Sequence, residues 1–591
     1  MKNLMEKKWA LAGLATLWGA IPVVLAIYWL VLHLIFRGYG GLQQSFSLWL
    51  NMATNVHSGV FMVWLTVCFF LSAALLLIVR YSVVDSTSSG YNDWYSSSQD
   101  RAKTDAQRDA EHNRVRFSTR VYGYSAIVLG LIAVLSFANL IVTTNMSDQT
   151  ASSFYDRAAV VYTPSIKNAP GALQYLLSGA KKSSNGCWEA NSPVPNCVKI
   201  GTLPQAGFDP RVSSAAGALT VMQRTSGTRQ NVNLWPASLE YLNGNGKDGV
   251  WSAIRDGSGV WQPTEGVVEW NGQSLPTECT FGGTDRFNRA FHGQKSNSLI
   301  NYVKRAYPNL YWSDNDTFGY CSPQHRPVIV LPVSKQISYA SATLSVPAGV
   351  LVLKGSRSGN PKITYMAHAK NLPGAAYPVS VADAQLASVN FLAGRGAHDK
   401  HQFGFETANA SGNISDFLLK SRADGHVYWV TPLTLANSQS QLFVAYAMVR
   451  ADTVTSGHLN QMKIYVLGEN DPRAINIDQL EAAAKTYMVN NAGGFIPSGG
   501  QLLEFTPAQG DFWRAFGEIN GRVIYRLDIS ANANETPILV SLDQGSTSTT
   551  PTGSTPTSPN ASSGQLPSYC TQSLGSLSTS QKFACARYFL N

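Results

Sequence analysis

Hydrophobic residues are concentrated in three long segments near the start of the chain. These segments cover residues 9–36, 60–79 and 121–142, and none of them contains Asp, Glu, Lys or Arg. Each reaches or exceeds the roughly 20 residues that a helix needs to cross about 30 Å of hydrocarbon. We therefore predict three N-terminal transmembrane α-helices in a membrane domain that covers residues 1–144.

The first segment shares one property with a signal peptide, because Lys2, Lys7 and Lys8 precede it. Its apolar stretch, however, is far longer than the roughly 7–15 residues of a signal-peptide core. No Ala-x-Ala-like cleavage pattern follows it before Arg37. We therefore interpret this segment as a retained anchor.

The positions of Lys and Arg near the segment ends predict the orientation. The N-terminal tail is basic, and the connection 37–59 carries only Arg37, whereas the connection 80–120 carries seven Lys and Arg residues. Basic loops stay on the cytoplasmic side of a membrane. We therefore expect a cytoplasmic N-terminus, a cytoplasmic loop 80–120 and an extracytoplasmic region after residue 143. The expected location is a bacterial cytoplasmic membrane, and the expected first partner is the lipid bilayer.

The region after the membrane domain has a different pattern, with short β-branched and aromatic runs between Gly, Asn and Pro turns. This pattern predicts strands at residues 328–333, 349–353, 363–366, 427–430, 442–448, 462–467 and 522–529. Helices are expected at 381–391 and 477–488, the second with Asn476 as its N-cap and Gln479 as the capping partner. The predicted fold class is therefore a large β-rich extracytoplasmic region, either α+β or mainly β.

Composition divides this region further. We expect a membrane-proximal connector at 145–180 with short helices at 153–162 and 171–177, a β-rich first ectodomain at 181–330 and an α+β second ectodomain at 331–543. Residues 544–566 are almost entirely Ser, Thr, Pro, Gly and Asn, which is typical of a flexible linker. The last part, 567–591, is predicted to be a small segment held by a disulfide.

Six of the seven cysteines lie after the third apolar segment. An even number of cysteines in an extracytoplasmic region favours disulfides over free thiols. Their spacing predicts three local pairs, which are Cys187–Cys197, Cys279–Cys321 and Cys570–Cys585. This interpretation agrees with the orientation that the basic residues indicate.

Tryptophans recur in the first ectodomain at Trp251, Trp261 and Trp270, each after a turn that contains Gly. This spacing is typical of a short antiparallel meander. The three rings could form a row that stacks on sugars, but they could equally fill the core of a small sheet. The second interpretation is favoured, because aromatic residues in strands usually pack against neighbouring side chains.

Signals for chemistry are weak. His398 and His401 form an H-D-x-H pattern that could bind a metal, but the helical H-E-x-x-H arrangement is absent. The segment Gly355–Gly359 has the spacing of a nucleophile elbow but carries Arg357 where the nucleophile would stand. We therefore identify no catalytic residue, expect no cofactor and regard an enzyme as the less favoured interpretation.

Charge and length then limit the function. The chain has 591 residues and a net charge of +9, and after residue 144 basic residues exceed acidic ones by only five. This small excess argues against nucleic acid as a partner. We expect an integral membrane protein whose extracytoplasmic region binds membrane or envelope proteins as a structural or interaction component of a larger complex, with homo-oligomerisation left open. The alternative is an extracytoplasmic protein that binds or modifies glycans.

Overall fold

The computed structural model describes residues 66–78, 80, 120–138, 151–166 and most of 181–542. The last range has gaps at residues 185, 190–196, 227–230, 239–248, 258–260, 272–274, 292, 294–296, 313–315, 340–341, 371, 393–404, 408–416, 436–441, 469–470, 521 and 532–534. The chain separates into two units, Met1–Leu542 and Asp543–Asn591. The first predicted span, most of the loop 80–120, the linker 544–566 and the segment 567–591 lie outside the described residues.

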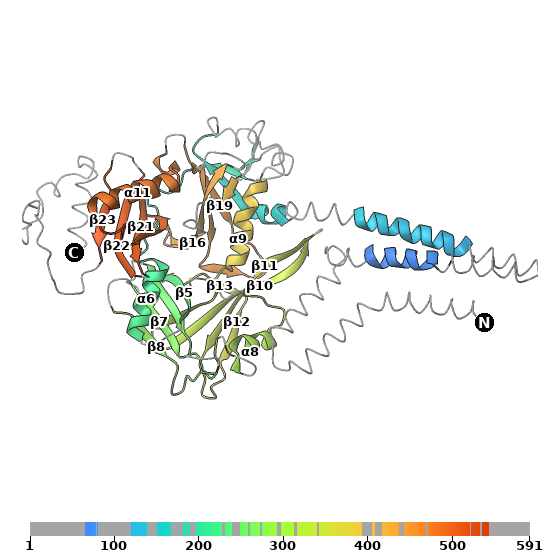
Figure 1. Ribbon diagram of the computed structural model, residues 1–591, viewed down its shortest axis with the longest axis horizontal. Helices are drawn as coiled ribbons and strands as arrows, with labels where there is room; N and C mark the ends of the chain where they lie inside the picture. Colours follow the sequence, from blue (N-terminus) through green and yellow to red (C-terminus); the bar gives the residue numbers. More distant parts are fainter. Residues whose placement is uncertain are drawn as a thin grey trace, which may run out of the picture. The chain divides into compact units, whose positions relative to one another are not determined.

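Two apolar helices are described in the membrane domain, Thr66–Ile78 and Arg120–Ala138 (Figure 1). Arg120–Ala138 has 19 residues and is the one helix in the described part of the chain that is long and apolar enough to cross a membrane. It coincides with most of the third predicted span. Thr66–Ile78 covers only part of the second, so the structure supports one membrane-crossing helix where the sequence predicts three.

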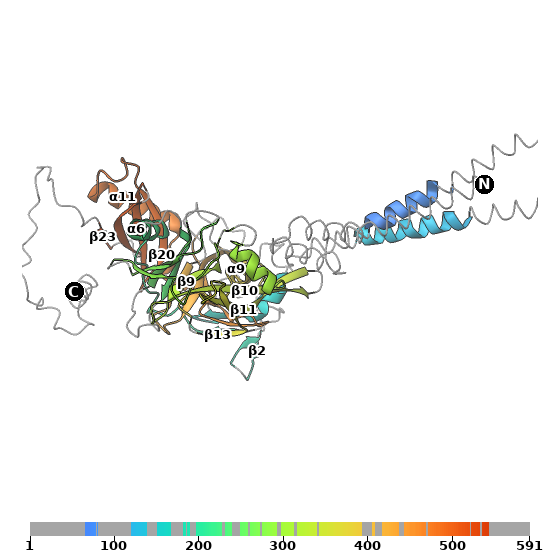
Figure 2. The same ribbon diagram turned by 90° about the horizontal axis from the view of Figure 1, so that it is seen from below.

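Small residues bring these two helices together, and they run side by side in both Figure 1 and Figure 2. A Cβ placed on Gly130 would lie 3.9 Å from the Cβ of Ala73, and one placed on Gly123 would lie 3.0 Å from Nη1 of Arg80. The earlier residue of the second helix, Gly123, lies near the later residue Arg80, and Gly130 lies near Ala73, so the two helices are antiparallel. Small side chains allow this close approach, as in membrane helix pairs.

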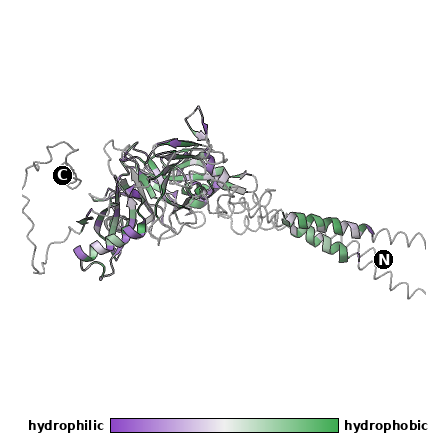
Figure 3. Cartoon of the chain, turned by 90° about the horizontal axis from the view of Figure 1, so that it is seen from above, coloured by the Kyte–Doolittle hydropathy of each residue, from purple (hydrophilic) through white to green (hydrophobic). Residues whose placement is uncertain are grey.

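The large apolar side chains of this helix pair point away from the contact. The buried residues are Cys68, Ser72, Ala73, Leu76, Ala126 and Ala133. The exposed ones include Phe70, Ile78, Ile127, Leu131 and Phe137. Figure 3 shows both helices coloured as hydrophobic along most of their length. Apart from Leu76, the pair therefore buries small residues and exposes most of its large apolar ones.

The rest of the described chain is β-rich, as predicted, and its strands form five sheets. The largest has nine strands in the order β14-β16-β17-β19-β1-β4-β3-β2, with β15 also paired to β16. Its strands are β14 (Phe405–Thr407), β15 (Phe417–Lys420), β16 (Val427–Leu435), β17 (Ala445–Arg450), β19 (Met462–Val466), β1 (Ala159–Thr163), β4 (Val198–Ile200), β3 (Trp188–Glu189) and β2 (Lys181–Lys182).

Strand β1 lies in the interior of this sheet and pairs in parallel with β19 on one side and β4 on the other. The sequence analysis placed these residues in a helix at 153–162, and this was wrong. Residues 151–155 are helical and η2 (Asp156–Ala158) follows, but the chain then becomes extended. The run Ala-Val-Val-Tyr-Thr is rich in β-branched residues, which favour strands. Its apolar residues are continuous because the strand is buried on both faces.

A second sheet contains β9 (Phe318–Cys321), β10 (Pro327–Tyr339), β11 (Ala342–Lys354) and β12 (Lys362–Met366) in the order β12-β11-β10-β9. Alternate residues of β10 enter different cores. Val328 and Val330 face the core shared with the nine-stranded sheet, whereas Ile329, Leu331 and Val333 face the opposite core. The position 330/331, which the sequence analysis took as a domain boundary, falls inside this strand.

The three smaller sheets complete the β-rich part. They are β20 (Gln501–Pro507), β21 (Phe512–Ile519), β22 (Arg522–Ser530) and β23 (Ile538–Ser541); β5 (Asn231–Ser238), β6 (Gly249–Arg255), β7 (Gly266–Trp270) and β8 (Thr277–Thr280); and β13 (His368–Lys370) with β18 (Thr453–Thr455). Consecutive strands pair antiparallel in the first two. The sheet β5–β8 is therefore an antiparallel meander, but only Trp251 in β6 and Trp270 in β7 lie on its strands, and Trp261 lies in the turn between them.

Helices cover the sheets and separate the cores. The described helices of this region are α6 (Ala215–Ser226), α8 (Leu299–Ala306), α9 (Val379–Ser388) and α11 (Ile477–Asn491), with short turns η5 (Val389–Phe391) and η6 (Pro472–Ala474). One core lies between the nine-stranded sheet, α9 and the sheet β9–β12. The other face of the nine-stranded sheet packs on α11 and the sheet β20–β23. The nine-stranded sheet is therefore a central layer with a core on each face.

Each predicted element of the second ectodomain has a counterpart, but β10 ends six residues later than predicted and β11 begins seven residues earlier. The strand predictions correspond to β10, β11, β12, β16, β17, β19 and β22, and the two helix predictions to α9 with η5 and to α11. The Asn476 side chain accepts a hydrogen bond from the Gln479 backbone N–H at 2.8 Å, so the predicted N-cap of α11 is also confirmed.

Two of the predicted disulfides are present. Cys187–Cys197 links the residue before β3 to the residue before β4, and Cys279–Cys321 links β8 to β9. All four of these cysteines are buried. The third predicted pair, Cys570–Cys585, lies outside the described residues. Cys68, in the helix Thr66–Ile78, is a free and buried cysteine.

Candidate functional site

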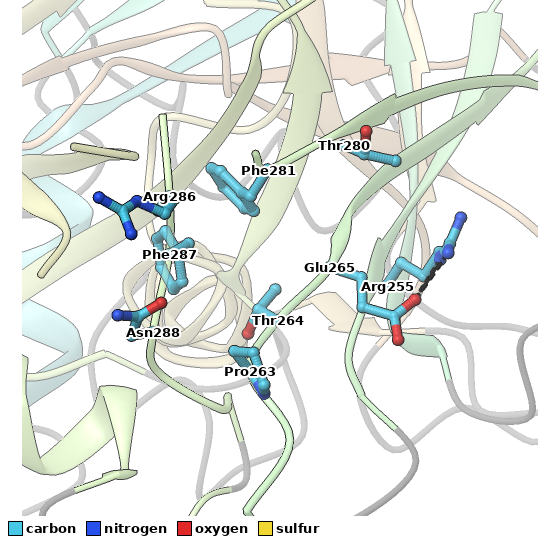
Figure 4. Close-up of a pocket in the computed structure, with 9 residues that line it drawn as sticks. All are labelled: Arg255, Pro263, Thr264, Glu265, Thr280, Phe281, Arg286, Phe287 and Asn288. Atoms are coloured by element: carbon cyan, nitrogen blue, oxygen red, sulfur yellow. Dashed lines mark hydrogen bonds and ion pairs between the residues drawn. The ribbon is translucent and has the colours of Figure 1, made fainter. Parts of the chain in front are cut away.

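A pocket of about 300 Å³ opens where three strands of the small sheet begin or end. Strand β6 ends at Arg255, β7 begins one residue after Glu265, and β8 ends at Thr280. Pro263 and Thr264 contribute the turn before β7. The remaining lining residues are Phe281, Arg286, Phe287 and Asn288, from the loop after β8, as shown in Figure 4. We call this cavity the Phe281 pocket.

One wall of the Phe281 pocket is aromatic. The rings of Phe281 and Phe287 are stacked with their centroids 4.4 Å apart. Phe287 is buried in the core beside α8, and Phe281 is half-buried against the same core. The stacked pair is therefore fixed from behind and presents a rigid apolar surface to the pocket.

The opposite wall is an ion-pair cluster. Arg255 donates to Glu265 Oε2 through Nη2 at 2.6 Å, and to Glu278 Oε2 through Nη1 at 2.5 Å. Glu265 directly precedes β7, which pairs with the strand of Arg255, and Glu278 lies on β8, on the far side of β7. One guanidinium that pairs with two carboxylates is held in a single position. Figure 4 shows Arg255 and Glu265 on the side of the cavity away from the phenylalanines.

A buried carboxylate supports the base of the pocket. The Thr264 hydroxyl donates to Asp256 Oδ1 at 2.8 Å, and the Phe291 backbone N–H donates to the same oxygen at 3.0 Å. Asp256 therefore ties the turn before β7 to the end of the loop after β8. These bonds hold the two sides of the pocket at a fixed separation.

The loop after β8 is also bound to the hairpin between β11 and β12. The Asn288 backbone N–H donates to the Gly359 carbonyl at 2.6 Å, and Arg286 Nη2 donates to the Arg357 carbonyl at 2.6 Å. Gly359 has φ +82°, and a Cβ at this position would collide with the Asn288 side chain. The segment Gly355–Gly359, considered above as a nucleophile elbow, is thus a hairpin turn that supports the pocket.

The structure separates Trp261 from the other two tryptophans that could have formed a sugar-stacking row with it. Trp251 and Trp270 are cross-strand partners on the face of the sheet that packs against α6, and Trp251 is only 3% exposed. Trp261 is 62% exposed and lies in the turn two residues before Pro263. Trp251 therefore fills a core, as in the favoured interpretation, whereas Trp261 is next in sequence to the Phe281 pocket.

The predicted metal ligands His398 and His401 lie outside the described residues. Within the ranges that the structure describes, no three His, Cys, Asp or Glu side chains come close enough to hold a metal ion.

A second polar cluster lies at the start of β16. His426 Nδ1 is 2.9 Å from Asp452 Oδ2, and Arg450 Nε donates to the other oxygen of Asp452 at 2.6 Å. Nearby, the Tyr428 hydroxyl donates to Asp424 at 2.6 Å, and burial raises the pKa of Tyr428. A carboxylate–imidazole pair is one part of a catalytic triad, but no Ser or Cys hydroxyl or thiol bonds to His426 in the described part of the chain.

Two acidic side chains are buried away from the pocket. Burial raises the pKa of Asp156 to about 8, and the Ser388 hydroxyl partly offsets this. Burial likewise raises the pKa of Glu269 to about 7, although Oε1 of Glu269 accepts the Cys321 backbone N–H at 2.9 Å. Both carboxyl groups sit in cores that stabilise their protonated form.

The sequence analysis did not single out the Phe281 pocket. The signal that could have found it is the placement of Arg255 and Glu265 at the two ends of the turn between predicted strands, where opposite charges pair across a hairpin. Phe281 and Phe287 gave no such signal, because their contact depends on the path of a loop.

Comparison with known proteins adds no relative. Neither the family models nor the curated proteins nor the solved structures contain a match to this chain.

Proposed function

We propose that this chain is an integral membrane protein whose β-rich domain lies outside the cytoplasm and binds other proteins of the cell envelope or surface. In this proposal three helices, at 9–36, 60–79 and 121–142, anchor it with the N-terminus in the cytoplasm. The β-rich domain then serves as a structural or interaction component of a larger complex.

The observation that carries the proposal is the arrangement of the helix pair. Small residues such as Ala73 and Gly130 lie in the contact, while large apolar residues such as Leu131 and Phe137 are exposed. In water such a surface would be unfavourable, whereas in a bilayer it contacts lipid tails or partner helices. This supports a membrane location for both helices.

The disulfides support the proposed side of the membrane. Disulfides persist in oxidising compartments and are rare in the cytoplasm. Cys187–Cys197 and Cys279–Cys321 are both in the part of the chain that the basic residues place outside. The predicted spans contain no Asp, Glu, Lys or Arg, which favours an anchoring role over ion transport.

Cysteine labelling tests the orientation. In a Cys68→Ser background, single reporters Ser47→Cys, Ser88→Cys and Ser554→Cys would be exposed to a membrane-impermeant maleimide on intact spheroplasts. We expect labelling of Ser47→Cys and Ser554→Cys above the level of the background protein, and labelling of Ser88→Cys only after lysis. The reverse pattern, or release of the protein by alkaline carbonate, would contradict the proposed topology.

Crosslinking tests the assembly role separately. The full chain would be crosslinked in its native membrane, extracted in detergent and analysed by mass. We expect a species larger than the monomer that contains either further copies of this chain or other membrane proteins. A protein that is monomeric before and after extraction would argue against assembly while leaving the anchoring intact.

A further inference from the structure

We propose that the Phe281 pocket binds one ring of an uncharged sugar. This inference goes beyond anchoring and assembly and does not depend on them. It moves the glycan-binding alternative from the three tryptophans, which the structure separates, to a site that sequence analysis did not identify.

The two walls of the pocket have the chemistry that a sugar ring requires. A pyranose has apolar C–H faces that pack on an aromatic ring, and hydroxyl groups around its edge that need hydrogen-bond partners. The stacked Phe281 and Phe287 provide the aromatic surface. The Arg255–Glu265 pair and Asn288 provide polar groups on the other sides of the same cavity (Figure 4).

Several polar atoms around the pocket have hydrogen-bonding capacity left for a ligand. Glu265 uses Oε2 for both of its bonds to Arg255, and its Oε1 has no partner in the described part of the chain. The side-chain amide of Asn288 and the hydroxyl of Thr280 likewise form no hydrogen bond with the described residues. A carboxylate acceptor, an amide and a hydroxyl together match the mixed donors and acceptors of a polyol.

The charge balance favours a neutral ligand over an anion. Arg255 is matched by Glu265 and Glu278, and Arg286 adds one further positive charge at the rim. Two basic and two acidic groups leave no net charge to attract a phosphate or sulfate. An anion would also have to approach the free oxygen of Glu265, which carries negative charge.

The size and rigidity of the cavity fit one or two sugar rings. A volume of about 300 Å³ is at the lower end of the range for small-molecule sites. The Asp256 bonds and the Asn288–Gly359 bond fix both sides of the cavity without a ligand. A preformed site loses little entropy on binding, but one ring has few atoms, so we expect dissociation constants on the order of 1 mM.

The test uses the full chain in nanodiscs, which contain no sugar-headgroup detergent. Binding of glucose, galactose, N-acetylglucosamine and their β-linked disaccharides would be measured by saturation-transfer NMR, with glucose 6-phosphate and sulfate as anionic probes. We expect at least one neutral sugar to bind. Phe281→Ala should weaken its binding at least about tenfold, because the stacking surface is lost.

A second variant protects the test against unfolding of the first. Asn288 is exposed and its side chain makes no hydrogen bond with the described residues, so Asn288→Ala should fold normally and still weaken binding about threefold or more. Leu275→Ala, at an exposed residue outside the pocket, is the matched control and should bind like the parent protein.

Three results would overturn the proposal. They are the absence of binding by every neutral sugar in the panel, tighter binding of an anionic probe than of any neutral sugar, and loss of binding in Trp261→Ala with unchanged binding in Phe281→Ala and Asn288→Ala. None of these results would bear on the topology, which the maleimide labelling decides.

Discussion

The helix pair and the β-rich domain bury opposite kinds of side chain. In the helix pair the buried residues are mostly small, such as Ala73 and Ala126, and most large apolar residues other than Leu76 face outward. In the β-rich domain many large side chains, such as Trp513 and Phe505, are almost fully buried. The difference follows from the surroundings, because burial of large apolar groups stabilises a fold only where the alternative is water.

Removal of a large core side chain from the β-rich domain should have the largest effect on the free energy of unfolding. Trp513 stacks on Phe443 at 5.5 Å between centroids and is almost fully buried. We expect Trp513→Ala to lower the free energy of unfolding by roughly 3–5 kcal/mol. Leu135→Ala, on the exposed side of Arg120–Ala138, should change it by less than about 0.5 kcal/mol.

Urea unfolding of the full chain in nanodiscs, followed by tryptophan fluorescence, would measure both variants. Equal losses of stability would show that Leu135 is packed as tightly as Trp513, and the comparison between the two regions would then fail.

Removal of a disulfide should have the next largest effect on the free energy of unfolding, and this effect should be limited to the β-rich domain. In the chain-entropy treatment, the 42-residue separation of Cys279 and Cys321 stabilises the fold by roughly 4 kcal/mol. The 10-residue separation of Cys187 and Cys197 gives roughly 3 kcal/mol. We therefore expect the double Ser variant of the first pair to melt at a lower temperature than that of the second.

Reduction with dithiothreitol should reproduce both losses and leave helix content in the membrane domain unchanged. Circular dichroism of the full chain, with and without reductant, would check this. A melting temperature that does not respond to reductant would contradict a stabilising role for both bonds.

A charged residue on the exposed side of the helix pair should have an effect of intermediate size on the free energy of membrane insertion. If Leu131 faces lipid, Leu131→Arg should oppose insertion by about 2.5–3.5 kcal/mol. Ile200→Arg, at an equally exposed apolar residue in β4, is the matched control and should have no such effect. The measured quantity is the fraction of protein that resists alkaline carbonate extraction, and equal fractions would place Leu131 in water.

Buried acids should make the free energy of unfolding depend on pH. Since the folded-state pKa of Asp156 is raised to about 8, the native protein keeps its proton while the unfolded chain loses it above about pH 4. Stability should therefore fall as the pH rises from about 4 to about 8, and Glu269 should add to this fall up to about pH 7.

Asp156→Asn should reduce this slope and raise stability at pH 7 by at least about 1 kcal/mol, because the amide has no proton to lose. Asp478→Asn, at an exposed residue of α11, should leave the slope unchanged. Urea unfolding at several pH values measures both, and a parallel pH dependence in Asp156→Asn and the parent protein would contradict the assignment.

Much of the fold was predictable where local pattern determines structure. The continuous apolar run of β10, the Asn476 cap of α11 and the glycine turns between Trp251 and Trp270 each act over a few residues. The two described disulfides were predictable because the members of each pair lie close together in sequence. The strand β1 was missed because its partners are distant and its burial on both faces removes the alternation that marks most strands.

The pocket was not predictable for a related reason. Arg255 and Glu265 meet through a hairpin, which a sequence can indicate, but Phe281, Phe287 and Asn288 reach the same place through loop contacts with the β11–β12 turn. Such contacts depend on the whole three-dimensional path of the chain. The tryptophans showed the reverse problem, since their regular spacing in sequence did not put them in a row: Trp251 and Trp270 pack together against α6, and Trp261 lies in an exposed turn.

The position of β1 also constrains the order of events during folding. Ala159 pairs with Met462, about 300 residues later in the chain, so the central strand cannot complete its hydrogen bonds until most of the polypeptide has been synthesised. The early segments are therefore synthesised before their partner strands. During this time their apolar strands are unpaired and can form non-native contacts. For a chain translocated as it is made, this delay keeps the domain unfolded until translocation is nearly complete.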